Sequence, residues 1–262
     1  MADQDPGELK TVGSMFSGIG GWDLAARECG LTTRWVAEQN PFRRLILETH
    51  FPGVHQYSDV AAIGPDADPV DILCASFPCQ DVSNARHSTR SKNSKHGVNG
   101  SRSGLFREVI RVARLHRPRY IVMENVPGLL HSGFEHVLCE LAESGFDAEW
   151  DCVSASAIGA PHVRDRLWIV AYPDSLLRYG EPDQALGPGL RERIDGLRAG
   201  AGSRWGTDTF PAGMVDELPS WLDRCTSLGD SLVPAIAEQV LRQVVAFDQR
   251  VRAQASGEGV RA

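Results

Sequence analysis

Short apolar runs alternate with segments of helical periodicity along most of this chain. The apolar runs predict buried strands at Thr11–Phe16, Thr33–Ala37, Val70–Cys74, Tyr120–Met123 and Arg166–Tyr172. The periodic segments predict helices at Trp22–Cys29, Pro41–His50, Gly104–His116, Phe134–Glu143 and Val233–Phe247. Such alternation is typical of an α/β fold, in which helices cover both faces of a parallel sheet.

This pattern breaks after Tyr172. Residues 173–225 are rich in Pro, Gly, Arg and Asp and hold no sustained period. We therefore expect a large domain made of residues 1–172 and 226–252, with a small irregular module at 173–225 inserted into it. Residues 253–262 are expected to form a disordered tail, because helical periodicity fades past about residue 249.

Composition narrows the class of protein. The chain has 262 residues, of which 42% are hydrophobic, enough for a large buried core. No apolar run approaches the roughly 18 to 20 residues that span a bilayer, and residues 1–10 are polar and acidic, unlike a secretion leader. The six cysteines form no CxxC pair and no zinc-like cluster with histidine. We expect a cytoplasmic protein with no membrane contact and no metal.

Charge is distributed unevenly along the chain. The formal net charge is −7, yet the stretch from Arg86 to Arg119 holds ten Lys or Arg residues and a single acid, Glu108. This stretch is either a flexible loop plus a solvated helix face, or a track that binds phosphates. Both interpretations stay open at this point.

A glycine-rich turn joins the first predicted strand to the first predicted helix. Glycines in the turn, Ser17-Gly18-Ile19-Gly20-Gly21, let a backbone approach a nucleotide-like ligand closely and direct helix N–H groups at it. Asp23 stands where a dinucleotide fingerprint needs its third glycine, which disfavours NAD. Glu38 ends the second strand, where an acid can bond ribose hydroxyls. The alternative is a structural turn followed by an exposed glutamate.

Two further predicted strands end in reactive residue types. Cys79 follows Pro78 on a polar loop, where a thiolate can be exposed and stabilised, although a free cysteine is more often buried and inert. Glu124 and Asn125 follow the strand Tyr120–Met123. Chemistry collects at the carboxyl edge of such sheets, although a single glutamate at a strand end is often only a solvated turn residue.

Seven blocks occur in a fixed order along the chain. They are Phe16-Ser17-Gly18-Ile19-Gly20-Gly21, Glu38, Asp59 within Tyr57-Ser58-Asp59-Val60, Phe77-Pro78-Cys79-Gln80, Glu124-Asn125-Val126, Arg164-Asp165-Arg166 and Gly229-Asp230-Ser231-Leu232-Val233-Pro234. In content and order these blocks resemble those of the cytosine-C5 DNA methyltransferases. The resemblance covers most of the chain.

The resemblance implies a Rossmann-like methyltransferase sheet with a small target-recognition domain, S-adenosylmethionine as cofactor and S-adenosylhomocysteine as product. It assigns cofactor binding to Phe16, Ser17, Gly18, Ile19, Gly20, Gly21, Glu38, Asp59, Pro78 and Ser231. It assigns catalysis to Cys79, Glu124, Arg164 and Arg166. DNA contact is expected from Gln80, Ser83, Arg86, Arg90, Lys92, Lys95, Asn99, Arg102 and Asn125.

The implied reaction explains these residue types. Carbon 5 of cytosine is a poor nucleophile, so the Cys79 thiolate must first add to carbon 6 and push electrons into the ring. Glu124 would protonate N3, and Arg166 would support O2 electrostatically. The target base must leave the duplex for this chemistry, and the basic loop 81–103 would close over the flipped DNA.

Departures from the family pattern are few. His162 stands where the family usually has Gln, Asp230 where it usually has Asn, and Ser58 where it often has Gly. The module at 173–225 takes the place of the recognition domain and offers few base readers. Its candidate readers are Arg191, Arg193, Arg198, Arg204 and Trp205. We expect a target of about two to four specified base pairs, because so few side chains can read base edges.

Three other functions compete with this prediction. An RNA methyltransferase would share the catalytic set, but the Cys-Phe-Thr signature of that branch is missing here. A DNA-binding protein without catalysis would not need Cys79, Glu124 and Arg166 together. An NAD oxidoreductase lacks its third glycine. We expect a monomer that binds double-stranded DNA, with a cognate restriction endonuclease encoded nearby if the gene belongs to a restriction-modification system.

Overall fold

The computed structural model describes residues 7–78, 104–178, 186, 190, 192–196, 226–227 and 229–255. Its strands are β1 (Thr11–Met15), β2 (Thr32–Ala37), β3 (His55–Tyr57), β4 (Ile72–Ala75), β5 (Tyr120–Asn125), β6 (Phe146–Ser154) and β7 (Asp165–Pro173). Its α-helices are α1 (Gly21–Glu28), α2 (Pro41–His50), α4 (Leu105–His116), α5 (Phe134–Glu143) and α8 (Pro234–Ala255). Short 3-10 turns are η1 (Val60–Ala62), η3 (Pro127–His131), η4 (Ala155–Ile158) and η5 (Asp174–Arg178).

The strands form one sheet of seven in the order β3-β2-β1-β4-β5-β7-β6. The strands from β3 to β5 run parallel, whereas β7 is antiparallel to both β5 and β6. The expected α/β class is confirmed, but the expectation of a fully parallel sheet is wrong at β7. The reason is the short connection from β6 through η4 to β7, which cannot hold the crossover that a parallel pair needs.

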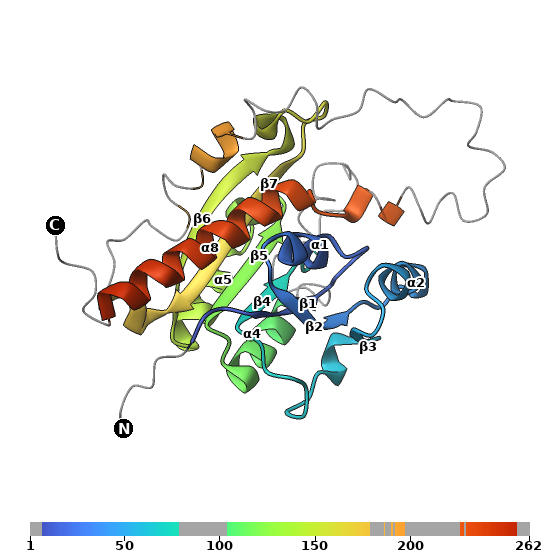
Figure 1. The fold of residues 1–262 in the computed structure, drawn as a ribbon, viewed down its shortest axis with the longest axis horizontal. Coiled ribbons are helices and arrows are strands. Elements are labelled where there is room, and N and C mark those ends of the chain that lie inside the picture. The colour runs from blue at the N-terminus through green and yellow to red at the C-terminus, as the bar shows by residue number, and fades with distance from the viewer. Residues whose placement is uncertain are drawn as a thin grey trace, which may run out of the picture.

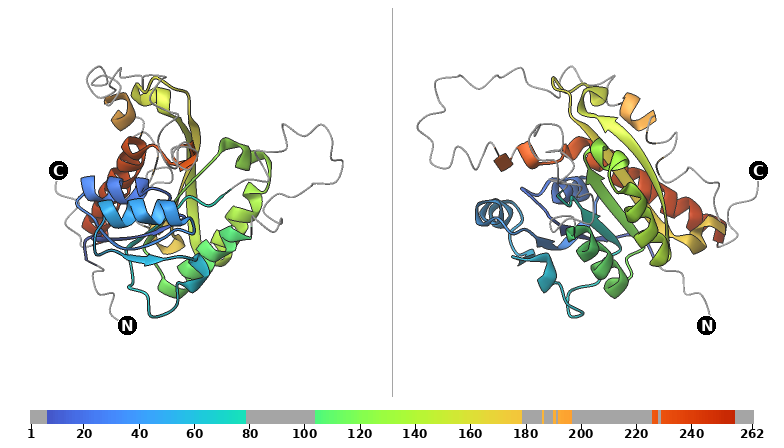
Figure 2. Two further views of the ribbon diagram at one scale, coloured as in Figure 1. Left: turned by 90° about the vertical axis from the view of Figure 1, so that its right-hand side faces the viewer. Right: turned by 180° about the vertical axis from the view of Figure 1, so that it is seen from behind.

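Helices cover both faces of this sheet, as Figures 1 and 2 show. On one face, α1 and α8 pack over a core that includes Val12, Val122 and Trp168. On the other face, α4 and α5 pack over Leu73, Ile121 and Ile169. Successive side chains along a strand point to opposite faces of the sheet. A continuous apolar run such as Tyr120–Met123 is therefore buried on both faces.

The C-terminal helix α8 is longer than its apolar pattern predicts. It continues beyond Phe247 to Ala255, past the expected end of the helix. Asp248 is buried against Arg119, and Val251 is buried in the core, so the last turns are held by packing and by an ion pair. The buried acid Asp248 interrupts the apolar pattern of the helix, so that pattern does not predict the continuation. Within the described part of the chain, no helix has both the length and the apolarity to cross a membrane.

The sequence pattern does not predict the two edge strands, β3 and β6. β3 has only three residues, and β6 carries acidic side chains at Asp147, Glu149 and Asp151 between its apolar ones. Short strands and charged residues are common at sheet edges, where they discourage pairing with other chains. Their patterns therefore resemble loops more than buried strands.

Candidate functional site

The glycine turn lies at the carboxyl end of β1. Phe16, Gly18 and Gly20 all have positive φ, at 54°, 59° and 87°. At Gly20 a Cβ atom would lie 2.5 Å from the ring of Phe51, so both the backbone conformation and the space require glycine there. Around Gly18, by contrast, a Cβ would meet nothing within 4 Å, so this backbone faces open space. The backbone of the turn is therefore accessible at Gly18.

Glu38 is fastened to this turn. Its carboxylate accepts hydrogen bonds of 2.8 Å from the backbone N–H groups of Gly18 and Asn40. The residue is buried, so the alternative of an exposed glutamate after a structural turn is wrong. Asn40 in turn caps α2 by accepting from Phe42 and Arg43 N–H groups. A carboxylate has about four lone-pair sites that can accept hydrogen bonds, and these two bonds leave about two of them unused.

Asp59 follows the next strand, β3. Its carboxylate accepts a 2.9 Å hydrogen bond from the N–H of Ala61 and so caps η1. The side chain is exposed, and β3 pairs directly with β2, which ends at Ala37, immediately before Glu38. The two acids therefore follow adjacent strands at one edge of the sheet, as sequence analysis expects for a cofactor site.

A buried acid and an arginine meet across β5 and β7. Nε of Arg166 lies 2.8 Å from Oε1 of Glu124, and their side chains are 18% and 7% exposed. Burial raises the pKa of the Glu124 carboxyl, and the charge of Arg166 opposes that rise. Because burial favours the neutral form, this acid is a candidate proton donor, and the Arg166 guanidinium stabilises its ionised form. The alternative of a solvated turn residue at Glu124 is therefore wrong.

Arg164 points elsewhere. Its Nη2 donates a 2.6 Å hydrogen bond to the carbonyl oxygen of Ser231, and its buried Nε has no hydrogen-bond partner. Burial lowers the pKa of its guanidinium, and the charge of Arg166 adds to this effect. Of the two predicted arginines, the structure places only Arg166 in an ion pair with Glu124, while Arg164 holds the C-terminal block.

The loop that leads from β4 to Cys79 begins within the described residues and continues outside them. Outside lie Cys79, Gln80, Ser83, Arg86, Arg90, Lys92, Lys95, Asn99 and Arg102. Ahead of Cys79, the N–H of Ser76 donates to the carbonyl of Met15 at 3.3 Å, and Nδ2 of Asn125 donates to the carbonyl of Phe77 at 3.0 Å. Asn125, which is predicted to contact DNA, is buried in this structure, and its amide holds the start of this loop. Cys79 follows the partly buried Pro78.

The C-terminal block returns to the glycine turn. A Cβ at Gly21 would lie 2.9 Å from Cδ1 of Leu232, so the two segments are in close contact. Asp230 forms an ion pair with Arg43 of α2, with 2.5 Å between Oδ2 and Nη2. Nε of Arg43 also donates a hydrogen bond to the hydroxyl of Ser227. The departure at Asp230 therefore has a partner, which sequence analysis missed because nothing in the spacing of one sequence links α2 to this block. The departure at Ser58 has no structural explanation.

Three arginines of α4 form ion pairs with nearby acids. Arg107 pairs with Glu140 at 3.8 Å, and Arg111 pairs with Glu108 and donates to two backbone carbonyls near η1. Arg114 pairs with Glu140 and bonds Ser144. These contacts fasten α4 to its neighbours and support the interpretation of this part of the basic stretch as a solvated helix face. Its first part, from Arg86 to Arg102, lies outside the described residues.

Asp23 is a buried acid whose titration the structure makes testable. It is 1% exposed, and Thr33 donates to its Oδ1 at 3.1 Å while its Oδ2 has no hydrogen-bond partner. Burial raises its pKa to about 7. Because the unfolded pKa is about 3.9, the folded state favours the protonated acid, and its contribution to stability is lost as pH rises from about 4 to 7.

We expect Asp23→Asn to remove this pH dependence. Relative to the variant, the wild-type protein should lose about 2 kcal/mol of unfolding free energy between pH 5 and pH 7, since one pKa unit is about 1.4 kcal/mol. Urea unfolding of both proteins at matched pH values measures the difference, and all other titrating groups cancel. Parallel curves across that range would show that Asp23 titrates as it does in water.

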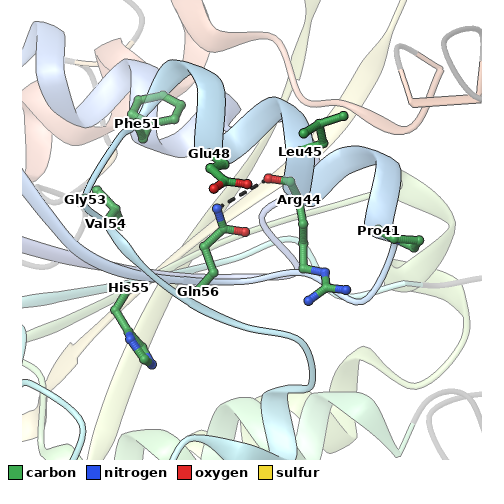
Figure 3. A pocket seen from close by; sticks show the side chains of 9 residues that line it. All are labelled: Pro41, Arg44, Leu45, Glu48, Phe51, Gly53, Val54, His55 and Gln56. Atoms are coloured by element: carbon green, nitrogen blue, oxygen red, sulfur yellow. Dashed lines mark hydrogen bonds between the residues drawn. The ribbon is translucent and has the colours of Figure 1, made fainter.

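A separate hollow of about 690 Å³ opens beside α2 and β3 (Figure 3). The amide of Gln56 donates to the carbonyl of Arg44 at its centre. The residues that line it are Pro41, Arg44, Leu45, Glu48, Phe51, Gly53, Val54, His55 and Gln56. It includes none of the predicted site residues. Among the described residues, no three His, Cys, Asp or Glu side chains gather as a metal site.

Comparison with known proteins connects this geometry to a family. The model of the family described as "C-5 cytosine-specific DNA methylase" matches residues 10–187, well over half of the chain. Type II methyltransferase M2.BsuMI of Bacillus subtilis is 33% identical over 171 residues, which are 62% of this chain and 42% of that protein. M.Sau3AI of Staphylococcus aureus is 29% identical over 188 residues, covering 64% and 44%. The chain thus spans less than half the length of these two relatives.

Solved structures agree on the fold. A proposed DNA modification methyltransferase encoded within an E. coli prophage superposes with a TM-score of 0.54 at 23% identity, covering 68% of this chain and 51% of that one. The Dnmt2 methyltransferase of S. pombe gives a TM-score of 0.51 at 19% identity, covering 71% and 60%. At such identities the likeness concerns the arrangement of the sheet and helices alone.

Proposed function

Because this chain belongs to the C-5 cytosine-specific DNA methylase family, we propose that it transfers a methyl group from S-adenosylmethionine to carbon 5 of cytosine in double-stranded DNA. The observation that carries the proposal is the buried Glu124–Arg166 pair, whose acid lies on β5, the strand next to β4 and its anchored loop. That loop leads directly into Cys79. An acid and a thiol on neighbouring strand ends are what addition to a pyrimidine ring requires.

The residues at the edge of the sheet fit the methyl donor. Gly18 faces open space, the Glu38 carboxylate keeps free lone pairs for ribose hydroxyls, and Asp59 follows on the adjacent strand. Phe16, Ser17, Ile19, Gly20, Gly21, Pro78 and Ser231 complete the proposed site. When bound, S-adenosylmethionine supplies an electrophilic methyl group on a sulfonium centre.

In the proposed reaction, the Cys79 thiolate forms a bond to carbon 6 of cytosine. Glu124 donates its proton to N3 as electrons move into the ring, so no full negative charge builds up on the base. Arg166 lies beside the acid, where its charge stabilises the carboxylate that remains. After carbon 5 has been methylated, a base removes the proton on carbon 5, the electrons return to the ring and the bond to Cys79 breaks. N3 returns its proton to the Glu124 carboxylate, which restores the acid.

DNA binding extends the proposal beyond the described residues. The target cytosine must leave the stack, at a cost of a few kcal/mol, before Cys79 can reach it. We assign closure over the DNA to the loop at 81–103 and base recognition to the module at 173–225, with residues 1–172 and 226–252 as the catalytic domain. The type II relatives support a place in a restriction-modification system, with a cognate endonuclease and a cytoplasmic location.

Incubation of the purified protein with S-adenosylmethionine and unmethylated plasmid tests this function. Base-resolution mapping should show 5-methylcytosine at one short site of about two to four specified base pairs, because few side chains are available as base readers. Total tRNA serves as the parallel substrate. Label in tRNA alone would overturn the DNA assignment, and a site of six or more specified pairs would overturn the account of recognition.

A further inference from the structure

Ser76 lies where three parts of the proposed site meet. It follows β4, three residues before Cys79, and its N–H is bonded to the carbonyl at the end of β1. Its hydroxyl oxygen accepts a 3.0 Å hydrogen bond from the indole Nε1 of Trp22 in α1. Trp22 is fully buried, so this bond satisfies a donor that would otherwise be costly to bury.

The same hydroxyl reaches the acid on β5. Ala75 pairs with Met123 in the parallel register of β4 and β5, so the next residues, Ser76 and Glu124, lie side by side at these strand ends. Burial raises the pKa of the Glu124 carboxyl, and hydrogen bonding to the Ser76 hydroxyl opposes that rise because it favours the ionised form. A serine hydroxyl has one hydrogen to donate, and the Trp22 indole can only donate. The direction of both bonds is therefore fixed when Glu124 is ionised: Trp22 donates to Ser76, and Ser76 donates to Glu124.

We propose that Ser76 is a positioning residue, which passes a hydrogen bond from Trp22 to the carboxyl of Glu124 and thereby holds the proton donor of the reaction in its working orientation. The proposal rests on the function proposed above. It goes beyond that function because it connects the acid to the helix that begins at the glycine turn.

The contact between Arg166 and Glu124 does not by itself fix the orientation of the carboxyl, which is why a hydrogen bond from Ser76 is needed. Arg166 contacts Oε1 of the carboxyl, and a single contact leaves the group free to rotate about its last bond. A donor from β4, on the side of β5 opposite β7, fixes that rotation. The charged side chains that act on Glu124 are those of Arg166 and Arg164, both from the β7 side of the sheet.

Trp22 is itself held in place. Its ring packs edge-on against Trp168 at 5.5 Å between centroids, and Trp168 pairs with Glu124 in the register of β5 and β7. Trp22 directly follows Gly21, the last glycine of the turn. A shift of the turn would therefore move the Trp22 donor and, through Ser76, the acid. Neighbouring hydrogen bonds of this kind polarise and strengthen one another.

Three variants separate positioning from simple packing. Ser76→Ala removes the donor to Glu124, Ser76→Thr keeps a hydroxyl, and Trp22→Phe removes the indole N–H while keeping an aromatic ring. The probe is the carbon-13 signal of the Glu124 side-chain carboxyl, assigned by its loss in Glu124→Gln and followed against pH in the protein without DNA. Thermal unfolding of each variant confirms that it is folded.

We expect the pKa of Glu124 to rise in Ser76→Ala, because the bond that favours the ionised carboxyl is lost. It should rise less in Trp22→Phe and stay near the wild-type value in Ser76→Thr. A pKa that is unchanged in a folded Ser76→Ala protein would overturn the relay, and Ser76 would then only satisfy the indole. This titration needs no turnover, so it decides the proposal even if the protein methylates no DNA.

Kinetics provide the second measurement. Ser76→Ala should lower kcat by about tenfold, while KM for S-adenosylmethionine stays within about twofold of wild type, since general acid catalysis contributes about 10²- to 10⁴-fold and only its geometry is lost. The alkaline limb of the kcat profile should move to higher pH, and Ser76→Thr should restore both. An unchanged kcat with a raised KM would contradict positioning of the acid. Absence of methyl transfer by the wild-type protein would instead refute the proposed function.

Discussion

Replacement of Glu124 by glutamine is expected to reduce kcat for methyl transfer to duplex DNA by about 10²- to 10⁴-fold, the range of general acid catalysis. Glutamine keeps the shape of the side chain and can still contact Arg166, which lies 2.8 Å from the native carboxyl. It cannot deliver a proton to N3 of the base. The loss should therefore appear in kcat, with DNA binding almost unchanged.

Glu135→Gln is the matched control, because it makes the same change at an exposed position on α5. Radiolabelled methyl transfer and gel-shift binding to one duplex measure both quantities for both variants. The control should keep wild-type rates. If Glu124→Gln also retained wild-type kcat, the acid would have no part in the reaction, and the assignment of the proton donor would have to move to another group.

Replacement of Asp248 by alanine is expected to lower the free energy of unfolding by about 3 to 5 kcal/mol, the range for breaking a buried ion pair. Asp248 accepts from Nη1 of Arg119 through both carboxylate oxygens, at 2.8 and 2.9 Å, and from the hydroxyl of Tyr120 at 3.2 Å. The acid is 4% exposed and the arginine 12%. Its removal leaves a charge in the core beside the start of β5.

Glu238→Ala on the same helix is the control. Its partner is Arg242, four residues on, at 2.8 Å and 41% exposed, so this pair should contribute less than about 1 kcal/mol. Urea unfolding of the three proteins provides the comparison. Equal, small losses for both variants would mean that α8 is held by apolar packing alone, and that the continuation of the helix to Ala255 does not depend on Asp248.

Sequence patterns predicted most of the central sheet and its helices. The bounds of α2 and α5 match their periodic segments, because each has a clear apolar face and a start signal such as the proline at Pro41. β6 and the last turns of α8 were missed for a common reason. Their inward positions include charged or polar residues that are satisfied by partners distant in the chain, such as Asp248 by Arg119.

The candidate site likewise contains residues that the sequence predicts and residues that only the fold reveals. Residues within short blocks, such as Glu38 and Glu124, could be proposed from residue type and position at strand ends. Arg43, Ser76 and Trp22 could not, since their roles depend on pairs of side chains that only the fold brings together. The partners of the α4 arginines could not be predicted either. Only the fold shows that Glu140 of α5 lies beside Arg107 and Arg114.

The most direct test of the central claim uses a duplex in which 5-fluorodeoxycytidine replaces the target cytosine. Fluorine at carbon 5 cannot leave as a proton does, so the bond between Cys79 and carbon 6 should persist after methyl transfer. Denaturing electrophoresis with S-adenosylmethionine present should then show a protein–DNA adduct that disappears in Cys79→Ala. Methylation of ordinary DNA by a protein that forms no such adduct would contradict the account.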